Sequence, residues 1–341
     1  MEGLTGPFTD SLSLHGSGRG KLLLFGEHSA VYGEPAVGIP LPYETRLDIE
    51  LESGSNGSIR YTGMDEKEST LLWQMLNAEC AKLYPNAPPL NPKDWYGTAA
   101  YESTVPAYGG YGSSAAVCSA VADALLKGRT RQVDEKAALA NEGEKLFHGT
   151  PSGIDAILSS SQGLTAVYPH AAGAASGIFP SFRPLSGHGF FLVTASVPRK
   201  HSTKALIGKL RGLREANPKA VTESISELGA LANEAIRILI GKADARTLGE
   251  LATEAHVLLS QLELSIDETD YILNTGMLSG AAGGKLSGAG GGGACYLICE
   301  TEEVAQKVRN ALVDSFARKP ELQGRILPVL EIGEERVYER N

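Results

Sequence analysis

The sequence predicts a two-domain α+β protein. Its 341 residues are enough for two domains, each with a hydrophobic core of its own. Strand-like and helix-like segments are mixed in both halves of the chain, and no repeat of fixed length relates them. A loop rich in Gly, Pro and Ser (170–189) is predicted between two strands. We place the domain boundary there, which gives domains of residues 1–185 and 186–341.

The first predicted elements are strands. Residues 1–19 are rich in Gly and Ser, and we expect them to be mobile. The apolar run KLLLFG (21–26) predicts a buried strand, and the alternation in TRLDIELE (45–52) predicts a half-exposed one. SIRYT (58–62) follows the turn-forming GSNG, so we expect it to pair with residues 45–52.

The rest of the N-terminal half contains both kinds of element. Helical periodicity is present in residues 70–83 and again in residues 132–147, which end at the helix breakers of HGTPSG. Another helix is expected to begin near Ala115, directly after a glycine-rich loop. Extended segments are predicted at 101–106 and 163–169.

The C-terminal half is predicted to contain longer helices. Apolar residues recur at helical spacing in residues 218–240 and 247–263. Ser265 and Glu268 have the spacing of a capping box at the start of a third helix. Further elements are expected at 190–198 (strand), 294–300 (strand), 302–319 (helix) and 325–332 (strand).

Composition excludes several classes of protein. The net charge is −9 and the isoelectric point is near 5.4, so neither a nucleic-acid partner nor an anionic membrane is expected. The N-terminus lacks the pattern of a secretory signal, and no apolar run of about 18 residues is present. The four cysteines form no CxxC pair, which argues against zinc and fits a reducing compartment. We therefore expect a cytoplasmic protein.

The stretch YGGYGSSAA (108–116) is a candidate phosphate loop. Free N–H groups at a helix start and the helix dipole bind phosphate, and glycines let the backbone approach the ligand. Ser113 and Ser114 add hydroxyls for phosphate oxygens or a metal. The alternative is an ordinary tight turn with a serine cap. No Lys-Ser or Lys-Thr follows, so the loop is not a Walker motif.

A second glycine-rich stretch, GAGGGG (288–293), formally satisfies the dinucleotide pattern GxGxxG. That pattern should follow a strand and open a helix, whereas here the stretch precedes the predicted strand ACYLICE. We therefore reject a dehydrogenase of this type. Four consecutive glycines suit a backbone that packs against a ligand or another loop, and the alternative is a flexible hairpin.

Carboxylates come from NEGEKLFHGTPSGID (141–155). Glu144 lies near the end of a predicted helix, and Asp155 follows a turn containing Gly149, Pro151 and Gly153. A carboxylate, a serine hydroxyl and phosphate oxygens form a typical Mg²⁺ environment. A second carboxylate could accept the proton of a substrate hydroxyl during phosphoryl transfer. Taken singly, Glu144 would be read as part of a solvated helix face.

A buried cation is predicted in GKLLLFGEHSAVYG (20–33). Lys21 begins an apolar strand, where a charge needs a partner, and Asp155 is a candidate for it. Such a lysine would stabilise developing negative charge. Glu27 and His28 follow the strand in a predicted loop, although a single histidine is more often structural than functional.

These four stretches, in this order, resemble the motifs of the GHMP small-molecule kinases. YGGYGSSAA is similar to the ATP-phosphate loop usually written GLGSSAA, and KLSGAGGGG is similar to KLTGAGGGG. Galactokinases typically continue GEHTDY, and phosphomevalonate kinases usually carry Tyr in place of the histidine. GEHSAVYG together with HGTPSGID resembles the mevalonate kinases of the family. The resemblance spans residues 20 to 293.

The resemblance implies a fold, substrates and roles for residues. The fold would be an N-terminal domain of the ribosomal S5 type and a C-terminal ferredoxin-like domain, with the active site between them. The reaction would transfer the γ-phosphate of ATP to the 5-hydroxyl of mevalonate with Mg²⁺. A homodimer is common in the family, but no interface signature is evident in the sequence.

By resemblance, Asp155 matches the catalytic aspartate and Lys21 the lysine beside it. Ser114 and Glu144 match the Mg²⁺ ligands. The positions that match the phosphate loop are Gly109, Gly110, Tyr111, Gly112, Ser113 and Ser114. The positions that match the substrate pocket are Glu27, His28, Thr203, Gly288 and Ala289.

Two positions depart from the family pattern. Arg19 stands where a proline usually precedes Gly-Lys, and it could contact a phosphate or be solvated. Tyr111 replaces the usual leucine, and it could stack near the nucleotide or pack against KLSGAGGGG (285–293), which resembles the third motif of the family. The alternatives for function are another GHMP kinase, acting on phosphomevalonate or a sugar, and a non-catalytic nucleotide-binding relative.

Overall fold

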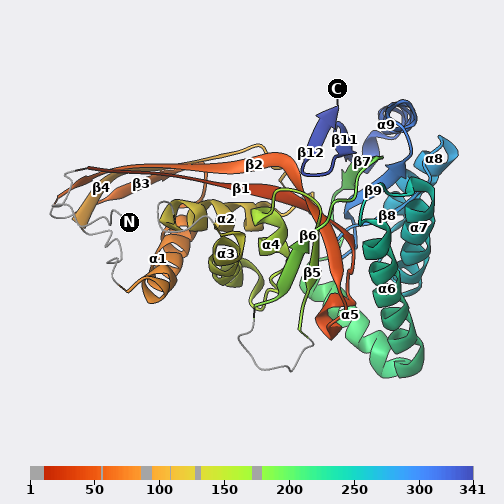
Figure 1. Ribbon diagram of the computed structural model, residues 1–341, viewed down its shortest axis with the longest axis horizontal. Coiled ribbons are helices and arrows are strands. Elements are labelled where there is room, and N and C mark those ends of the chain that lie inside the picture. Colours follow the sequence, from red (N-terminus) through yellow and green to blue (C-terminus); the bar gives the residue numbers. More distant parts are fainter. Residues whose placement is uncertain are drawn as a thin grey trace. The chain divides into compact units, whose positions relative to one another are not determined.

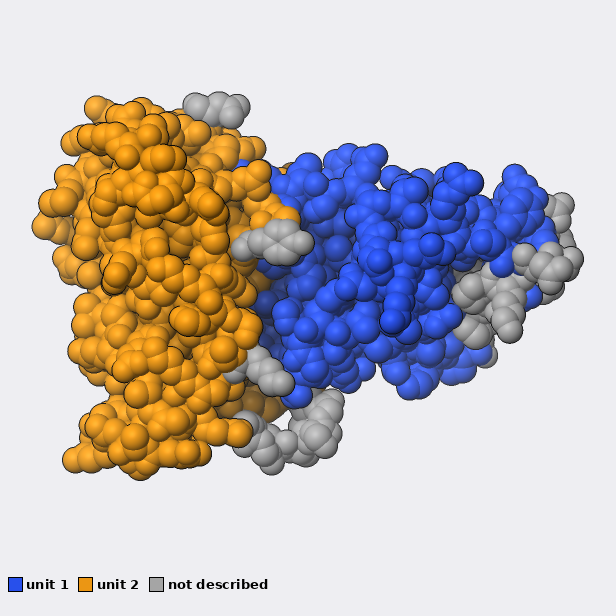
Figure 2. Space-filling view, turned by 180° about the vertical axis from the view of Figure 1, so that it is seen from behind, with its two compact units in different colours: residues 1–20, 43–105, 112–160 blue, residues 21–42, 106–111, 161–341 orange. Residues whose placement is uncertain are grey.

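The computed structural model describes residues 11–54, 57–85, 94–107, 109–126, 132–170 and 179–340, and the backbone alone for Lys204. By internal contacts the chain divides into two compact units (Figure 2). Unit 1 comprises residues 1–20, 43–105 and 112–160, and unit 2 comprises residues 21–42, 106–111 and 161–341. Each unit is therefore built from separate stretches of chain. This division by contacts differs from a single domain boundary at residue 185.

Unit 1 is a sheet covered by helices. Residues 45–53 of β2 (Ala36–Ser53) pair antiparallel with β4 (Trp95–Ser103), and β4 pairs in parallel with β3 (Ile59–Thr62). β1 (Ser11–Phe25) pairs with β2. Helices lie on one side of these strands (Figure 1). They are α1 (Glu66–Leu83), α2 (Ser113–Leu126), α3 (Val133–His148) and α4 (Ile154–Ser160).

Helix α2 is the centre of unit 1. Ten of its fourteen residues are buried, because it packs against α1, α3 and α4. Two glycines of β1 let that strand approach the helix closely. A Cβ atom on Gly16 would lie 2.0 Å from the carbonyl oxygen of Ala120, and one on Gly18 would lie 2.1 Å from that of Ala116. No side chain fits in either place, so glycine is required for β1 to pack on α2.

Unit 2 contains a second sheet, in the order β12-β11-β7-β9-β8, with β10 also paired to β7. Helices α8 and α9 cover apolar side chains of β7 and β9, while α7 packs on β8 and β9. The strands are β7 (Phe190–Val197), β8 (Gly283–Leu286), β9 (Gly293–Cys299), β10 (Arg325–Ile326), β11 (Val329–Ile332) and β12 (Val337–Arg340).

The helices of unit 2 include two long neighbours, α6 and α7, which lie side by side (Figure 1). The helices are α5 (Thr203–Ala216), α6 (Pro218–Ile238), α7 (Ala245–Gln261), α8 (Asp267–Leu278) and α9 (Glu302–Arg318). Unit 2 also holds β5 (Thr165–Tyr168), which pairs with residues 36–38 of β2 and with β6 (Ser181–Pro184). Among the described residues, no helix is long and apolar enough to cross a membrane.

Two expectations about the N-terminal strands are wrong. Residues 11–19 form part of β1 rather than a mobile tail, because their glycines serve close packing on α2; residues 1–10 lie outside the described residues. Residues 59–62 pair with β4 and not with the strand that precedes them, since β4 lies between β3 and β2 in the sheet. Turn residues alone did not specify this neighbour.

Three smaller expectations also need correction. The capping box is wrong: Ser265 Oγ donates to Asp270 Oδ1 (2.5 Å), and Glu268 pairs with Lys200 (2.6 Å). The last strand is split into β10 and β11, with Leu327 donating its N–H to Thr194 between them. The Gly-, Pro- and Ser-rich stretch contains β6, although residues 171–178 of it lie outside the described residues.

Candidate active site

Unit 1 brings together the two residues matched to metal ligands. Ser114 lies in the first turn of α2, and Glu144 lies one turn before the end of α3. His148, four residues after Glu144, connects them: its Nε2 is 3.1 Å from Ser114 Oγ and 3.7 Å from Glu144 Oε2. Residues four apart share a helix face, so α3 presents both side chains to α2.

The carboxylate of Glu144 is held in the interior of unit 1. Glu144 is 1% exposed, and the thiol of Cys118 in α2 donates a hydrogen bond to Glu144 Oε1 at 3.7 Å. Burial, and then the neighbouring carboxylate, raise the pKa of the Cys118 thiol well above its usual value. Gly143 permits this approach, since a Cβ there would lie 2.9 Å from Cys118 Sγ.

This donor set fits Mg²⁺ bound together with a nucleotide. A carboxylate and a hydroxyl are hard oxygen donors of the kind that Mg²⁺ prefers, and Mg²⁺ usually keeps waters or phosphate oxygens at its other positions. Within the described part of the chain, no group of three or more His, Cys, Asp or Glu side chains is arranged to hold a metal. The two residues would thus provide part of the coordination and the phosphates the rest.

Asp155 also belongs to unit 1. It is the second residue of α4, is half-buried, and follows Gly153, whose φ is +84°. This left-handed backbone conformation turns the chain from the end of α3 into α4, as the breaker cluster predicted. Lys21 is assigned to unit 2, where its side chain is buried at 5% exposure in β1. The partnership of Lys21 with Asp155 stays a prediction.

The phosphate loop contains residues of both units: Gly109, Gly110 and Tyr111 belong to unit 2, and Gly112 to Ser114 to unit 1. Gly110 and Gly112 have φ of +80° and +75°, which explains why glycine is needed there. The N–H of Lys21 donates to the carbonyl of Tyr111 at 2.8 Å, which ties β1 to this loop within unit 2. Ser113 begins α2 and is exposed.

Tyr111 is an interior residue. Its side chain is 1% exposed, and burial raises the pKa of its phenol. A ring so enclosed has no free face to stack on a nucleotide, so the loop can present only the backbone of Tyr111 to a ligand. Arg19 lies in β1, where its carbonyl accepts a hydrogen bond from the hydroxyl of Ser159.

Glu27 forms a buried ion pair that the sequence did not reveal. Its Oε1 lies 2.5 Å from Lys285 Nζ, and the two side chains are 1% and 0% exposed. Lys285 also donates to the carbonyl of Leu286 and lies over the rings of Phe25 and Tyr296. Burial raises the pKa of Glu27 and lowers that of Lys285, while their mutual attraction opposes both shifts. The pair therefore joins the loop of residues 26–28 to β8.

His28 connects the same two segments. Its φ is +62°, and its Nε2 is 3.2 Å from the carbonyl oxygen of Ala289. Burial lowers the pKa of His28, so the neutral ring is favoured, with Nε2 as the donor to that carbonyl. Gly288 and Ala289 follow β8 and are both half-exposed. A Cβ on Gly288 would meet nothing within 4 Å, so the space beside it is open.

The glycine-rich third motif is a hairpin connection between the antiparallel strands β8 and β9. It therefore does not open a helix, as a dinucleotide-binding loop would. Gly290 to Gly293 all have positive φ, and a Cβ on Gly290 would lie 2.3 Å from the carbonyl oxygen of Leu264. The glycines therefore fit a closely packed turn. Lys200 donates its N–H to the carbonyl of Gly291 at 2.8 Å.

Arg199 is a further residue that sequence reasoning did not single out, although it lies only four residues before Thr203. Its Nη1 is 3.4 Å from Thr203 Oγ1, and Thr203 is the first residue of α5. A Cβ on Gly110 would lie 3.1 Å from Arg199 Nη2, and one on Gly293 would lie 3.0 Å from its Nε. Within unit 2 its guanidinium thus lies between the phosphate loop and the third motif.

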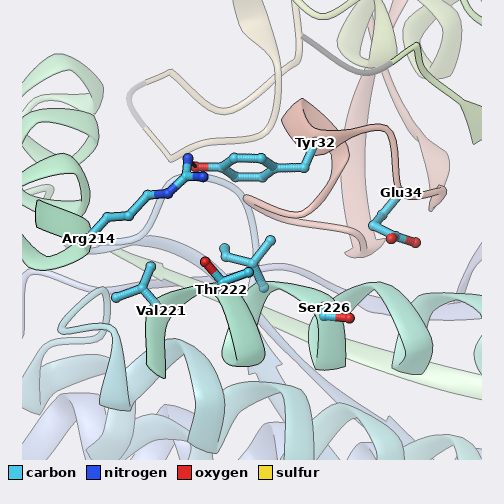
Figure 3. Close-up of a pocket in the computed structure, with 7 residues that line it drawn as sticks. Tyr32, Glu34, Arg214, Val221, Thr222 and Ser226 are labelled. Carbon is cyan, nitrogen blue, oxygen red and sulfur yellow. Dashed lines mark hydrogen bonds between the residues drawn. The ribbon is translucent and has the colours of Figure 1, made fainter. Parts of the chain in front are cut away.

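A separate pocket of about 180 Å³ in unit 2 contains none of these residues (Figure 3). Arg214 reaches over the ring of Tyr32, with its Cζ 5.0 Å from the ring centroid, and donates to the Tyr32 hydroxyl at 3.1 Å. The other lining residues are Glu34, Val221, Thr222, Ile225 and Ser226. We assign the pocket no part in the reaction.

The chain matches the family models of the GHMP kinase N-terminal domain, at residues 75–163, and of the GHMP kinase C-terminal region, at residues 223–318. Together the matches cover more than half of the chain, and they include Ser114, Glu144 and Asp155. The chain belongs to the GHMP kinase family, whose two-domain fold mixes helices and sheets. It is accordingly an ATP-dependent kinase.

The similar curated proteins are named mevalonate kinase. That of Pyrococcus horikoshii is 29% identical over 325 residues, covering 85% of this chain and 90% of the relative. That of Aeropyrum pernix is 28% identical over 318 residues, covering 88% of this chain and 92% of the relative. Both alignments therefore extend across most of either protein.

Solved structures agree with this fold. The L. major mevalonate kinase in complex with R-mevalonate has a TM-score of 0.76, with 21% identity, 97% coverage of this chain and 99% of that chain. The Lactococcus lactis galactokinase complexed with galactose has a TM-score of 0.69, with 15% identity, 96% coverage of this chain and 95% of that chain. At these identities the likeness shows the fold alone.

Proposed function

We propose that this protein is a mevalonate kinase, which transfers the γ-phosphate of ATP to the 5-hydroxyl of mevalonate and yields 5-phosphomevalonate and ADP. The observation that carries the proposal is the match to proteins named mevalonate kinase along 85% of the chain, with Lys21, Glu144 and Asp155 all present. A protein that only bound a nucleotide would have no chemical need for these three charged groups together.

Mg²⁺ would be held by Ser114 and Glu144, and it would neutralise charge on the β- and γ-phosphates of ATP. The N–H groups of the phosphate loop and of the first turn of α2 would bind the phosphate oxygens, with the positive end of the helix dipole adding to the attraction. Burial of Glu144 fixes the direction of its carboxylate, so little reorganisation is needed when the phosphates bind.

Asp155 and Lys21 have one role each in the chemical step. The 5-hydroxyl oxygen attacks the γ-phosphorus, its proton passes to the carboxylate of Asp155, and the bond to the β,γ-bridging oxygen breaks to release ADP. Lys21 stabilises the negative charge that develops during transfer. Because the transition state is loose, Asp155 can take the proton late and does not have to be a strong base.

The substrate would contact His28, Thr203, Gly288 and Ala289. The open space beside Gly288 supports this assignment, since a Cβ placed there would meet nothing within 4 Å. Glu27 has a different role in the proposal. Its carboxylate is engaged by Lys285 and is buried, so it positions the loop that carries His28 instead of binding the substrate directly.

Replacing Asp155 with Asn tests the proposal. Asn keeps the size of the side chain but cannot accept the proton, so we expect kcat with mevalonate to fall by about 10²–10⁴-fold. Affinity for ATP should change little, because Asp155 is not among the metal or phosphate ligands. The measurement is ADP release together with equilibrium binding of ATP. A kcat within a few-fold of the wild-type value would show that the catalytic centre is assigned wrongly.

A further inference from the structure

Two packed helices of unit 1 each contribute a pair of side chains to one cluster. Helix α2 contributes Ser114 and Cys118, and α3 contributes Glu144 and His148. Each pair is four residues apart, so each lies on one face of its helix. The contacts cross between the helices: His148 reaches Ser114 at 3.1 Å, and Cys118 reaches Glu144 at 3.7 Å.

His148 Nε2 is placed as a metal donor would be. It lies 3.1 Å from Ser114 Oγ and 3.7 Å from Glu144 Oε2. Around an octahedral ion with bonds near 2.1 Å, adjacent donor atoms are about 3 Å apart. The distances from Nε2 to Ser114 Oγ and to Glu144 Oε2 are equal to this spacing or slightly larger, so the nitrogen is placed to be an adjacent donor to each of these two oxygens.

The surroundings leave that nitrogen accessible. The side chain of His148 is 48% exposed, whereas that of Glu144 is 2% exposed, so the imidazole lies on the solvent side of the buried carboxylate. A Cβ on Gly149, the next residue, would meet nothing within 4 Å. In the tautomer protonated at Nδ1, the Nε2 lone pair accepts the Ser114 hydroxyl, and that lone pair is the one an ion would take.

A purely structural role for His148 is the competing explanation. A histidine in the last turn of a helix can simply stabilise the negative end of the helix dipole. That role needs no particular direction of the ring. Here Nε2 is directed at the two residues matched to metal ligands, one of them on another helix.

We propose that His148 is a third protein donor at the metal centre of Ser114 and Glu144, and that its nitrogen selectively strengthens binding of Mn²⁺ and Co²⁺. The inference rests on the proposed function, because it takes Ser114 and Glu144 as the residues that hold the cation of ATP. Imidazole nitrogen suits transition metals, whereas Mg²⁺ prefers oxygen donors. Removing the nitrogen should therefore weaken the binding of Mn²⁺ more than the binding of Mg²⁺.

The first test measures binding of Mn²⁺ to the full-length protein in the presence of ADP, by the electron paramagnetic resonance signal of free Mn²⁺. His148→Gln and His148→Ala should each raise the Kd for Mn²⁺ by about tenfold or more. The Kd for Mg²⁺, measured by competition, should rise much less. His170→Gln, at an exposed histidine outside the cluster, is the matched control and should leave both values unchanged. An equal rise in the Kd for both metals, or no rise in either, would overturn the proposal.

The second test detects the bond itself and does not depend on any variant. Electron spin echo envelope modulation of Mn²⁺ and ADP bound to wild-type protein should show coupling to nitrogen. Uniform ¹⁵N labelling of the protein, with unlabelled ADP, should convert the ¹⁴N signal to a ¹⁵N signal, because the nitrogen is in the protein. Absence of protein nitrogen coupling would rule out His148 as a ligand.

The outcomes separate this inference from the proposed function. Nitrogen coupling in a protein that does not phosphorylate mevalonate would support the donor role and reject the substrate. Phosphorylation of mevalonate without protein nitrogen coupling would support the substrate and reject the donor role of His148. Thermal unfolding of each variant without metal verifies that the loss of Mn²⁺ affinity does not come from a loss of fold.

Discussion

At the scale of single residues, the Glu27–Lys285 pair shows how a buried charge is tolerated in unit 2. Both side chains are almost fully buried and their charged atoms are 2.5 Å apart. Each charge would be very costly to bury without the other. The pair joins two segments more than 250 positions apart in the chain and so fixes the loop that carries His28.

Substitution of Lys285 by Met should therefore expose the cost of an unpaired carboxylate. We expect a loss of about 3–5 kcal/mol in the free energy of unfolding, since Glu27 stays buried without its cation. Combining it with Glu27→Met should recover most of this loss, because apolar side chains of similar volume can replace a buried pair. Urea unfolding of the single and double variants measures both effects. Additive losses in the double variant would mean that the two residues are not coupled.

The sequence predicted the type of most site residues but not their partners. Glu144 and Ser114 could be assigned from motif and residue chemistry, and their proximity follows from packing of α2 on α3. Lys285 stood in a quoted motif, yet nothing local indicated that it would pair with Glu27. Such contacts depend on the tertiary fold, which residue type and spacing alone do not determine.

At the scale of elements, α7 and β8 support the third motif through His256. Its Nε2 contacts Asp270 Oδ1 at 2.9 Å, and its Nδ1 accepts the N–H of Leu286, the last residue of β8, at 3.4 Å. Burial lowers the pKa of His256 from its ordinary value of 6.5, and the attraction of Asp270 only partly offsets this. The neutral ring, which can accept the N–H of Leu286, is thus favoured.

This arrangement predicts a loss of stability in mild acid. Because the pKa of His256 is lower in the folded protein, the unfolded chain binds the proton first as the pH falls below about 6.5. The contribution of His256 is complete above that pH and is lost as the pH falls through the folded-state pKa. Between pH 7.5 and 5, the free energy of unfolding of His256→Gln should fall less than that of the wild type. Parallel curves for the two proteins in urea titrations would contradict this.

Elements with strong periodicity were predicted well, and elements defined by close packing were not. The amphipathic patterns of 218–240 and 247–263 correspond to α6 and α7 within a few residues. Residues 11–19 looked flexible because of their glycines, but those glycines allow β1 to approach α2. A single sequence does not distinguish a glycine kept for flexibility from one kept for lack of space.

At the scale of the whole molecule, the chain is a GHMP kinase whose two compact units are each assembled from separate segments. Residues 21–42 and 106–111 group with unit 2 although most of the N-terminal half forms unit 1. A composition-based boundary cannot find such segments, because they carry no linker signal. The order and spacing of the four motifs, by contrast, were enough to identify the family.

The most direct test of the account is ADP release by the purified protein with Mg-ATP and each of mevalonate, phosphomevalonate and galactose as acceptor. We expect turnover with mevalonate alone, and a single phosphomonoester product. Turnover with phosphomevalonate or galactose instead would retain the family and the phosphate site, but it would contradict the roles given to His28 and Thr203. No turnover with any acceptor, despite ATP binding, would contradict the proposed activity.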